Sequence, residues 1–432
     1  PAYRRMLDLH ALHEVSQRFI DAPGSHFACT GFLTAGKAAG GRTLLARNFD
    51  FEGGAVFDRE KLVSVVAAEG KVPYLSVAFG GLVGVVTGFN RAGIAVAVHS
   101  IAGGQTARSG EPITILLADV LANETTLDGA IERIRRARVF VSDIVLLAEG
   151  PSGKLAIVEK TPHAFSVRRG GPDGWLAAAN VAESPDVVRS VRTPAGSTSR
   201  AREARLVQIL SARTGALDVP AAIAILRDTR SASGVELGPG NRNAIDALIA
   251  SHSVVFDLGA LRAWVAAAPR TRGAYVPVDL LAVLAARHGA DLRTATPIPA
   301  DPFLTSGGYD RYLEARSAIA RARSGERARA GAWKDEARRL LEDAHRLSPD
   351  FAAGTALLAE RLALDGDRVR ARALAEEALA HQPGPDPFFA ALAHVRDALA
   401  SGGALPKERL PYVLEPDEQV ASSPAADLPL AR

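Results

Sequence analysis

The chain has 432 residues, 47% of them hydrophobic and 23% charged, which excludes a collagen-like, mucin-like or wholly disordered protein. Its 51 basic and 48 acidic side chains leave a net charge of only +3, so no nucleic acid or anionic membrane is expected as a partner. One cysteine excludes an internal disulfide and a multi-cysteine zinc site, and the sequence indicates no metal cluster and no cofactor. The length predicts about two or three domains.

No stretch of about 18 apolar residues occurs, so no membrane span is predicted. The first residue is Pro1 rather than methionine, from which we expect that an upstream piece is missing. If that piece was a targeting signal, a periplasmic or secreted location is expected. Otherwise a cytoplasmic location is expected.

The first predicted element is an amphipathic helix over residues 3–20, which ends at the Pro23-Gly24 break. From Phe27 to about Val98, short apolar runs separated by glycines predict a sheet made of hairpins. The expected strands are Thr30–Ala35, Thr43–Arg47, Leu62–Ala67, Tyr74–Ala78, Val83–Thr87 and Ile94–Val98.

Paired helices then alternate with further strands. Helices are expected at Ile113–Asn123, Thr126–Arg136, 199–213 and 219–228. Strands are expected at Asp143–Ala148, Leu155–Glu159, Ala164–Arg168 and Trp175–Ala179, and near 246–250, 252–257 and 261–266. This order favours an α+β fold of antiparallel sheets with helices on their outer faces over a parallel βαβ sheet.

Beyond about residue 305 the pattern becomes helical and rich in Ala, Arg, Leu and Glu. A shift of 34 residues superimposes Ala337 on Ala371, Leu340 on Leu374, Ala344 on Ala378 and Pro349 on Pro383. Thirty-four residues is the tetratricopeptide period, so residues 305–405 are predicted to form an all-α repeat region that offers a surface for a protein partner. An Ala-rich helical bundle is the alternative. Residues 406–432 are expected to be poorly ordered.

Cys29 opens a predicted strand, and a glycine-rich turn returns the chain through Arg42–Arg47. A hairpin centred near Ala38 places Cys29 across from Asn48, give or take one residue. Either Arg47, Asn48 or Asp50 is therefore expected to touch the sulfur. A neighbouring guanidinium favours the thiolate and a carboxylate can orient a proton acceptor, which is the pattern of an activated nucleophile.

Such a nucleophile needs a base, and no histidine lies at a family-specific spacing from Cys29. If the backbone were cut between Ala28 and Cys29, the freed α-amino group would lie beside the sulfur. With an ordinary pKa of about 7.7–8.0, that amine could serve as the base. A Cys-His-Asp set with His252 and Asp257 is a weaker alternative.

The segments Cys29-Thr30-Gly31 and Arg47-Asn48-Phe49-Asp50 resemble the cysteine N-terminal nucleophile hydrolases. Within them they resemble the branch of choloylglycine hydrolases and acyl-CoA:6-aminopenicillanic acid acyltransferases. The likeness continues in order over about residues 27–270, through Asn90–Val98, Ile157–Lys160, Leu176–Asn180 and Ser197–Arg200.

This resemblance implies an αββα sandwich over residues 29–304 and a propeptide over 1–28, removed by self-cleavage between Ala28 and Cys29. It implies an activity on an acyl amide or acyl thioester through an acyl-enzyme on Cys29, by hydrolysis or acyl transfer. By position, Arg47 and Asp50 would tune and orient the nucleophile, Asn180 would donate to the oxyanion and Arg200 would brace the site.

Where the family usually has a second amide donor, this chain has His99-Ser100. Both are candidates for the oxyanion or substrate site, although His99 is also expected to titrate near neutrality. The competing hypothesis is an inactive sandwich that acts as a binding scaffold through its helical repeats.

Overall fold

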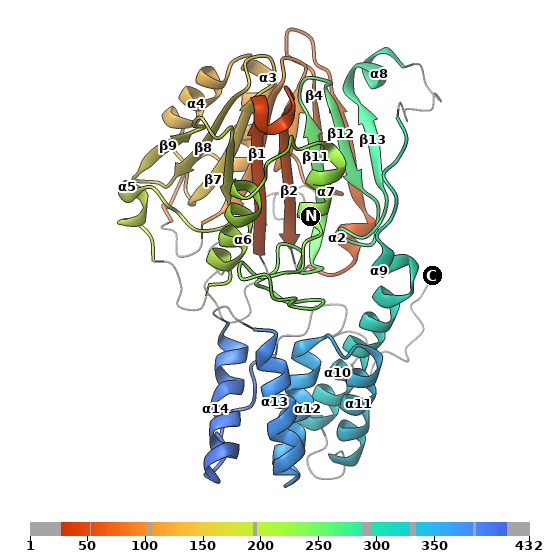
Figure 1. Cartoon of the computed structure of the whole chain (residues 1–432). Coiled ribbons are helices and arrows are strands. Elements are labelled where there is room, and N and C mark those ends of the chain that lie inside the picture. The colour runs from red at the N-terminus through yellow and green to blue at the C-terminus, as the bar shows by residue number, and fades with distance from the viewer. Residues whose placement is uncertain are drawn as a thin grey trace, which may run out of the picture.

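A computed structural model of the chain describes residues 27–51, 53–101, 106–192, 197–286, 295–328, 334–382 and 386–412. The helix expected at 3–20 and most of the expected tail lie outside these ranges. Figure 1 shows two stacked sheets with helices on both outer faces and a bundle of helices below them. The architecture is an αββα sandwich, followed by an all-helical region.

The first sheet is antiparallel, has six strands and runs in the order β10-β1-β2-β11-β12-β13. Its strands are β1 (Phe27–Ala35), β2 (Thr43–Phe51), β10 (Trp175–Ala178), β11 (Ala250–Asp257), β12 (Arg262–Ala266) and β13 (Tyr275–Asp279). A single turn of 3-10 helix, η1 (Gly36–Ala39), joins β1 to β2.

The second sheet is an antiparallel meander of seven strands, β3 to β9 in chain order. Its strands are β3 (Lys61–Val66), β4 (Tyr74–Phe79), β5 (Thr87–Asn90), β6 (Ile94–Ser100), β7 (Asp143–Glu149), β8 (Lys154–Lys160) and β9 (Phe165–Arg169). Each of its connections is local except that between β6 and β7, which carries two helices.

Helices α6 and α7 cover the first sheet, and α3 and α4 cover the second (Figure 1). The helices of the sandwich are α2 (Val56–Arg59), α3 (Ile113–Asn123), α4 (Leu127–Arg136), α5 (Pro185–Val188), α6 (Ser199–Ser211), α7 (Val219–Leu226) and α8 (Leu280–Ala285).

The alternation of side chains along each strand builds three apolar layers. In β1 and β2, Leu33 and Leu45 face the second sheet, whereas Phe32 and Leu44 face α6 and α7. On the opposite side of the sandwich, Val96 packs against α3 and α4. The central strands of each sheet are thus buried on both faces, which gives the sandwich its four layers.

Two of the expected strands are wrong in position. The pattern near 246–250 is an irregular segment, and β11 begins only at Ala250. The strand expected at Val83–Thr87 begins at Thr87 instead, because Gly84 adopts a left-handed backbone with φ 104°. The last strand, β13, was not among the expected strands. It contains Pro277, which it tolerates because it is the edge strand of the sheet.

The C-terminal part is helical from α9 (Pro302–Thr305) onward. It continues with α10 (Gly308–Ala328), α11 (Lys334–Leu347), α12 (Ala352–Leu364), α13 (Arg368–Ala380) and α14 (Pro387–Ser401). The superimposed residues Ala337 and Ala371 lie at matching places in α11 and α13, and both are fully buried in one core. In the described ranges, no helix is long and apolar enough to cross a lipid bilayer.

The layer between the sheets generates a test of the fold. Phe256 of β11 is fully buried, and the centre of its ring lies 5.0 Å from the centre of the Phe89 ring in β5. Phe256→Ala should lower the free energy of unfolding by about 3–5 kcal/mol, measured by urea titration, because it leaves a cavity between the sheets. Val369→Ala, at a position on α13 that is 86% exposed, is the control and should cost less than about 0.5 kcal/mol. Equal losses would contradict this arrangement of the layers.

Candidate active site

The pairing of β1 with β2 decides which side chains meet Cys29. Cys29 lies opposite Phe49, within one residue of the expected Asn48, and Gly31 lies opposite Arg47. Because directly paired residues share a face, Cys29, Phe49 and Arg47 point toward the second sheet. Asn48 and Asp50 point the other way. The register thus selects Arg47 from the three residues that the sequence left open.

Gly31 gives the Arg47 side chain room to cross beneath β1. A Cβ atom at position 31 would lie 3.1 Å from the Arg47 Cβ, 3.1 Å from Leu146 of β7 and 3.0 Å from the Ala46 carbonyl oxygen. A larger residue would therefore push the sheets apart or displace Arg47. The glycine of the Cys-Thr-Gly motif is explained by this close approach.

Arg47 is fully buried, and its Nη2 donates to the Cys29 sulfur over 3.0 Å. Its Nη1 donates to the Val86 carbonyl at 3.2 Å and to the Thr87 hydroxyl at 2.7 Å. In the described part of the chain, no carboxylate lies within ion-pair distance of this guanidinium. A buried cation without a counter-charge is costly, so the anion best placed to balance Arg47 is a thiolate at Cys29.

Two opposing effects act on the thiol. Burial raises the pKa of Cys29, while the Arg47 guanidinium and, more weakly, Arg202 act to lower it. The net direction in this uncut chain is upward. Any change that lets water reach the sulfur would weaken the effect of burial and leave the attraction to the cations.

Asn180 follows β10 and lies beside the backbone nitrogen of Cys29. Continuing the register of β1 and β10 from Gly31 and Ala178 brings residue 180 opposite residue 29. The Cys29 backbone N–H donates to the Asn180 Oδ1 over 2.6 Å, and the Asn180 Nδ2 donates to the Ser100 carbonyl over 2.9 Å. Asn180 therefore connects β1 to the end of β6.

The structure does not place Arg200 at this site; Arg202 lies there instead. Arg200 is exposed, whereas Arg202 is 1% exposed and its Nη1 donates to the Cys29 carbonyl at 2.6 Å and to the Thr30 hydroxyl at 2.6 Å. Its Nη2 reaches the Asn180 Oδ1 at 3.2 Å. Side chains two residues apart on a helix point to nearly opposite sides, so only one of these arginines can face the sheet.

A signal for Arg202 was present in the sequence. The Ser-x-x-Arg pattern of 197–200 recurs at 199–202, and the Arg202 Nη2 bonds the Ser199 hydroxyl at 3.0 Å. Only the choice between the two overlapping patterns was wrong. The rotation of α6 about its axis, which the sequence does not fix, decides which arginine faces the sheet.

Asp50 lies on the face of the sheet away from the sulfur, opposite Ala28. Burial raises its pKa to about 7, although Arg202 opposes the shift. Its Oδ2 has no hydrogen-bond partner among the described residues. A carboxyl that titrates near neutrality thus lies beside the bond between Ala28 and Cys29.

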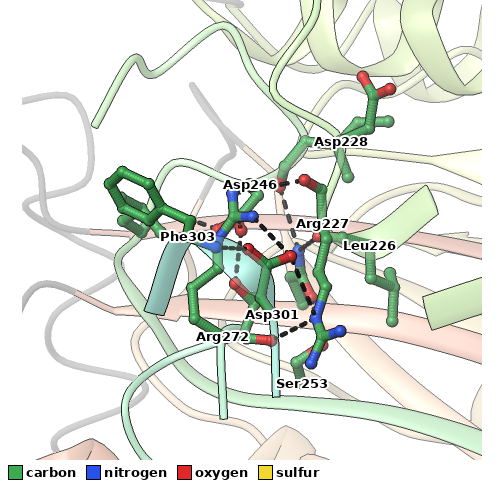
Figure 2. A network of polar contacts seen from close by, with 12 residues as sticks. Leu226, Arg227, Asp228, Asp246, Ser253, Arg272, Asp301 and Phe303 are labelled. Atoms are coloured by element: carbon green, nitrogen blue, oxygen red, sulfur yellow. Dashed lines mark hydrogen bonds and ion pairs between the residues drawn. The ribbon is translucent and has the colours of Figure 1, made fainter. Parts of the chain in front are cut away.

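The side chain of Asn48 fastens β2 to the layer behind it. Its Nδ2 donates to the carbonyls of Leu226 and Ile245 at 2.9 and 3.1 Å, and its Oδ1 accepts from Ser253 at 2.6 Å. Figure 2 shows the network around these partners, in which Arg272 bridges Asp246 and Asp301. This network holds the irregular segment 241–249 beside Asp50.

His99 and Ser100 do lie next to Asn180, at the end of β6. The His99 Nδ1 is 3.0 Å from the Ala179 carbonyl oxygen, which can only accept, so Nδ1 carries the proton. Burial, with Arg47 adding to it, lowers the pKa of His99 well below its usual value. The expectation that His99 titrates near neutrality is therefore wrong, and its buried Nε2 presents a lone pair rather than a donor.

His252 and Asp257 are not brought together. They lie five residues apart on β11, and Asp257 pairs with Arg42 at 3.6 Å near the other end of the strand. The Cys-His-Asp alternative is therefore not supported by the geometry. In the ranges that the structure describes, no three His, Cys, Asp or Glu side chains gather closely enough to hold a metal ion.

The comparisons with known proteins give one family. Residues 37–268 match the family described as acyl-coenzyme A:6-aminopenicillanic acid acyl-transferase, which is more than half of the chain. The matched range begins after Cys29 and includes Arg47, Asp50, Asn180 and Arg202. The comparison with curated protein sequences yields no match.

Several solved structures are similar at low identity. A Caenorhabditis elegans N-acylethanolamine-hydrolyzing acid amidase ortholog is 14% identical, with a TM-score of 0.40 over 54% of this chain and 93% of its own. A mutant conjugated bile acid hydrolase from Clostridium perfringens is 13% identical, with a TM-score of 0.39 over 62% and 95%. Penicillin V acylase from Agrobacterium tumefaciens is 19% identical, with a TM-score of 0.38 over 62% and 89%.

The two arginines of α6 offer a matched pair for a test. Arg202→Gln should lower the free energy of unfolding by about 1.5–3 kcal/mol, measured by urea titration, because it removes charge-assisted hydrogen bonds to buried acceptors. Arg200→Gln changes an exposed side chain and should cost less than about 0.5 kcal/mol. The reverse order of losses would contradict the assignment of Arg202.

Proposed function

The chain belongs to the acyl-coenzyme A:6-aminopenicillanic acid acyl-transferase family, and from this premise we propose that it is a self-cleaving cysteine amidohydrolase or acyltransferase with Cys29 as its nucleophile. The observation that carries the proposal is the 3.0 Å contact between the Arg47 Nη2 and the Cys29 sulfur. A buried guanidinium without a carboxylate partner gains most when the thiol ionises. A purely structural cysteine would not need this neighbour.

The first step of the proposal is a cut between Ala28 and Cys29. The sulfur attacks the Ala28 carbonyl carbon, a C–S bond forms, and the C–N bond to Cys29 breaks as its nitrogen takes a proton. Water then hydrolyses the thioester and releases residues 1–28. The cut converts the backbone N–H that now donates to Asn180 into a free α-amine beside the sulfur.

The second step acts on a separate acyl compound. The α-amine takes the thiol proton, the thiolate attacks the acyl carbonyl, and the same proton passes to the leaving amine or thiol. Water resolves the acyl-enzyme in hydrolysis, and an amine resolves it in acyl transfer. The family description names an acyl thioester, acyl-coenzyme A, and an amine, 6-aminopenicillanic acid. It therefore supports an acyl amide or acyl thioester as the substrate class.

The remaining polar groups have roles in stabilising charge and geometry. Asn180 is the proposed donor to the oxyanion, a role that typically contributes about 3–4 kcal/mol to the transition state. Arg202 braces the site through the Cys29 carbonyl and the Asn180 Oδ1. Neutral His99 offers an acceptor there, so the second donor is more readily supplied by Ser100 or a backbone N–H than by the imidazole.

Substitution of the nucleophile tests the proposal. The wild-type protein should yield a chain that begins at Cys29 in an intact mass spectrum, whereas Cys29→Ala should stay uncut and lose all hydrolysis of a panel of chromogenic acyl amides. Cys29→Ser is the graded control and should cut more slowly. A wild-type chain that remains at full length with full amidase activity would contradict the amine as base. A Cys29→Ala protein that keeps every activity would favour the binding scaffold.

Asp50 predicts a pH dependence of self-cleavage. Its carboxyl has a pKa of about 7, so it becomes a carboxylate as the pH rises through that value. Only the carboxylate can accept a proton or hold the emerging ammonium, so the cleavage rate should rise through about pH 7. Asp50→Asn should slow cleavage at least about tenfold and remove this inflection, as followed by timed gel electrophoresis. An unchanged inflection in Asp50→Asn would exclude Asp50 as its source.

A further inference from the structure

Two buried polar side chains lie behind the contact of Arg47 with Cys29 and have no part in the proposed mechanism. Thr87 begins β5 in the second sheet, and His252 lies on β11 in the first sheet, opposite Phe49. Both are fully buried. The two residues therefore face each other across the interior of the sandwich.

Thr87 links Arg47 to His252 through its hydroxyl group. Arg47 can only donate, so the Thr87 oxygen accepts from its Nη1 over 2.7 Å. The same hydroxyl oxygen lies 2.9 Å from the His252 Nε2, and the tautomer of His252 decides which of the two donates. The His252 Nδ1 has no hydrogen-bond partner among the described residues, so this bond is the one that holds the imidazole in the interior.

The ring of Phe49 closes the arrangement from the other side. The Arg47 Cζ lies 4.7 Å from the centre of that ring, and the His252 ring stacks on it at 4.9 Å with an angle of 6° between the planes. Arg47, Phe49, His252 and Thr87 thus form a closed cycle of contacts. The guanidinium is held by the ring, the Thr87 hydroxyl and the Val86 carbonyl.

We propose that Thr87 and His252 are positioning residues that fix the plane of the Arg47 guanidinium against the Cys29 sulfur. This inference rests on the proposed function of Cys29. One hydrogen bond to sulfur does not fix a side chain with as much rotational freedom as arginine, whereas acceptors in several directions do. Thr87 supplies such an acceptor, and His252 orients the Thr87 hydroxyl so that its lone pair faces Arg47.

His252 is neutral in this arrangement. Burial is the main cause that lowers the pKa of His252 well below its usual value, and the positive charges of Arg47 and Lys61 add to it. A protonated imidazole would also place a second cation next to the guanidinium. The neutral imidazole is therefore the form that persists near neutral pH.

Alkylation of the thiol tests this inference, because the chain has one cysteine and iodoacetamide therefore reports on Cys29 alone. Thr87→Val removes the hydroxyl at similar volume. It should slow alkylation of the purified protein, after residues 1–28 have been released, about tenfold near pH 7 and displace the rate profile to higher pH, since one hydrogen bond to a charged group is lost. Thr87→Ser should stay within about twofold of the wild type. His252→Phe keeps a ring on Phe49 but loses the hydrogen bond to Thr87, and should slow alkylation about threefold.

Thr43→Val is the matched control. Thr43 lies on β2 and is buried like Thr87, but its hydroxyl donates to the Gly150 carbonyl, away from Arg47. The alkylation rate of Thr43→Val should therefore follow pH as that of the wild type does. If Arg47→Gln is slow but Thr87→Val and His252→Phe react like the wild type, the positioning roles are wrong and the proposed function stands. If Arg47→Gln also reacts like the wild type, or if Cys29 is inert in every protein, both proposals fail. Should Thr87→Val unfold, His252→Phe decides.

Discussion

The burial of the Arg47 charge is the constraint around which this protein is built. The guanidinium lies between two sheets, where water cannot solvate it, and its hydrogen-bond acceptors are a sulfur, a carbonyl and a hydroxyl. Such a cation is tolerated because these acceptors converge on it and because the sulfur can become an anion. The same arrangement that makes Arg47 tolerable in the interior therefore also acts to lower the pKa of Cys29, against the effect of burial.

The two faces of the first sheet carry different polar groups around Cys29. The inner face carries Arg47 and the sulfur, while the outer face carries Asp50 and the partners of Arg202. Cys29 itself is joined to both, through its side chain on one face and its backbone nitrogen and carbonyl at the edge. The adjacent strands β1 and β2 thus bring Arg47 to the sulfur on one face of the sheet and Asp50 opposite Ala28 on the other.

The helical region is connected to this site by the segment 241–249. Ala247 and Ile249 pack against Ala28, whereas Leu248 between them is part of the core of the helical region. The Asn241 Nδ2 also donates to the Gln382 Oε1, after α13, at 2.8 Å. The sandwich therefore contacts one end of the helical region. The segment 241–249, which packs against Ala28, is held by contacts with both parts of the chain.

The residue pattern by itself predicted antiparallel sheets with outer helices, the helical region and the neighbourhood of Cys29, because alternation along strands and the short glycine turn are local properties. The αββα sandwich was predicted from the family resemblance rather than from these patterns. It left the register of β1 open by one residue, and a slip of one would have exchanged Arg47 for Asn48 and Asp50. Only the tertiary structure fixed this register, placed Arg202 rather than Arg200 at the site, and brought Thr87 into contact with His252. Each of these depends on how a helix or a second sheet is oriented against β1 and β2, which no local pattern records.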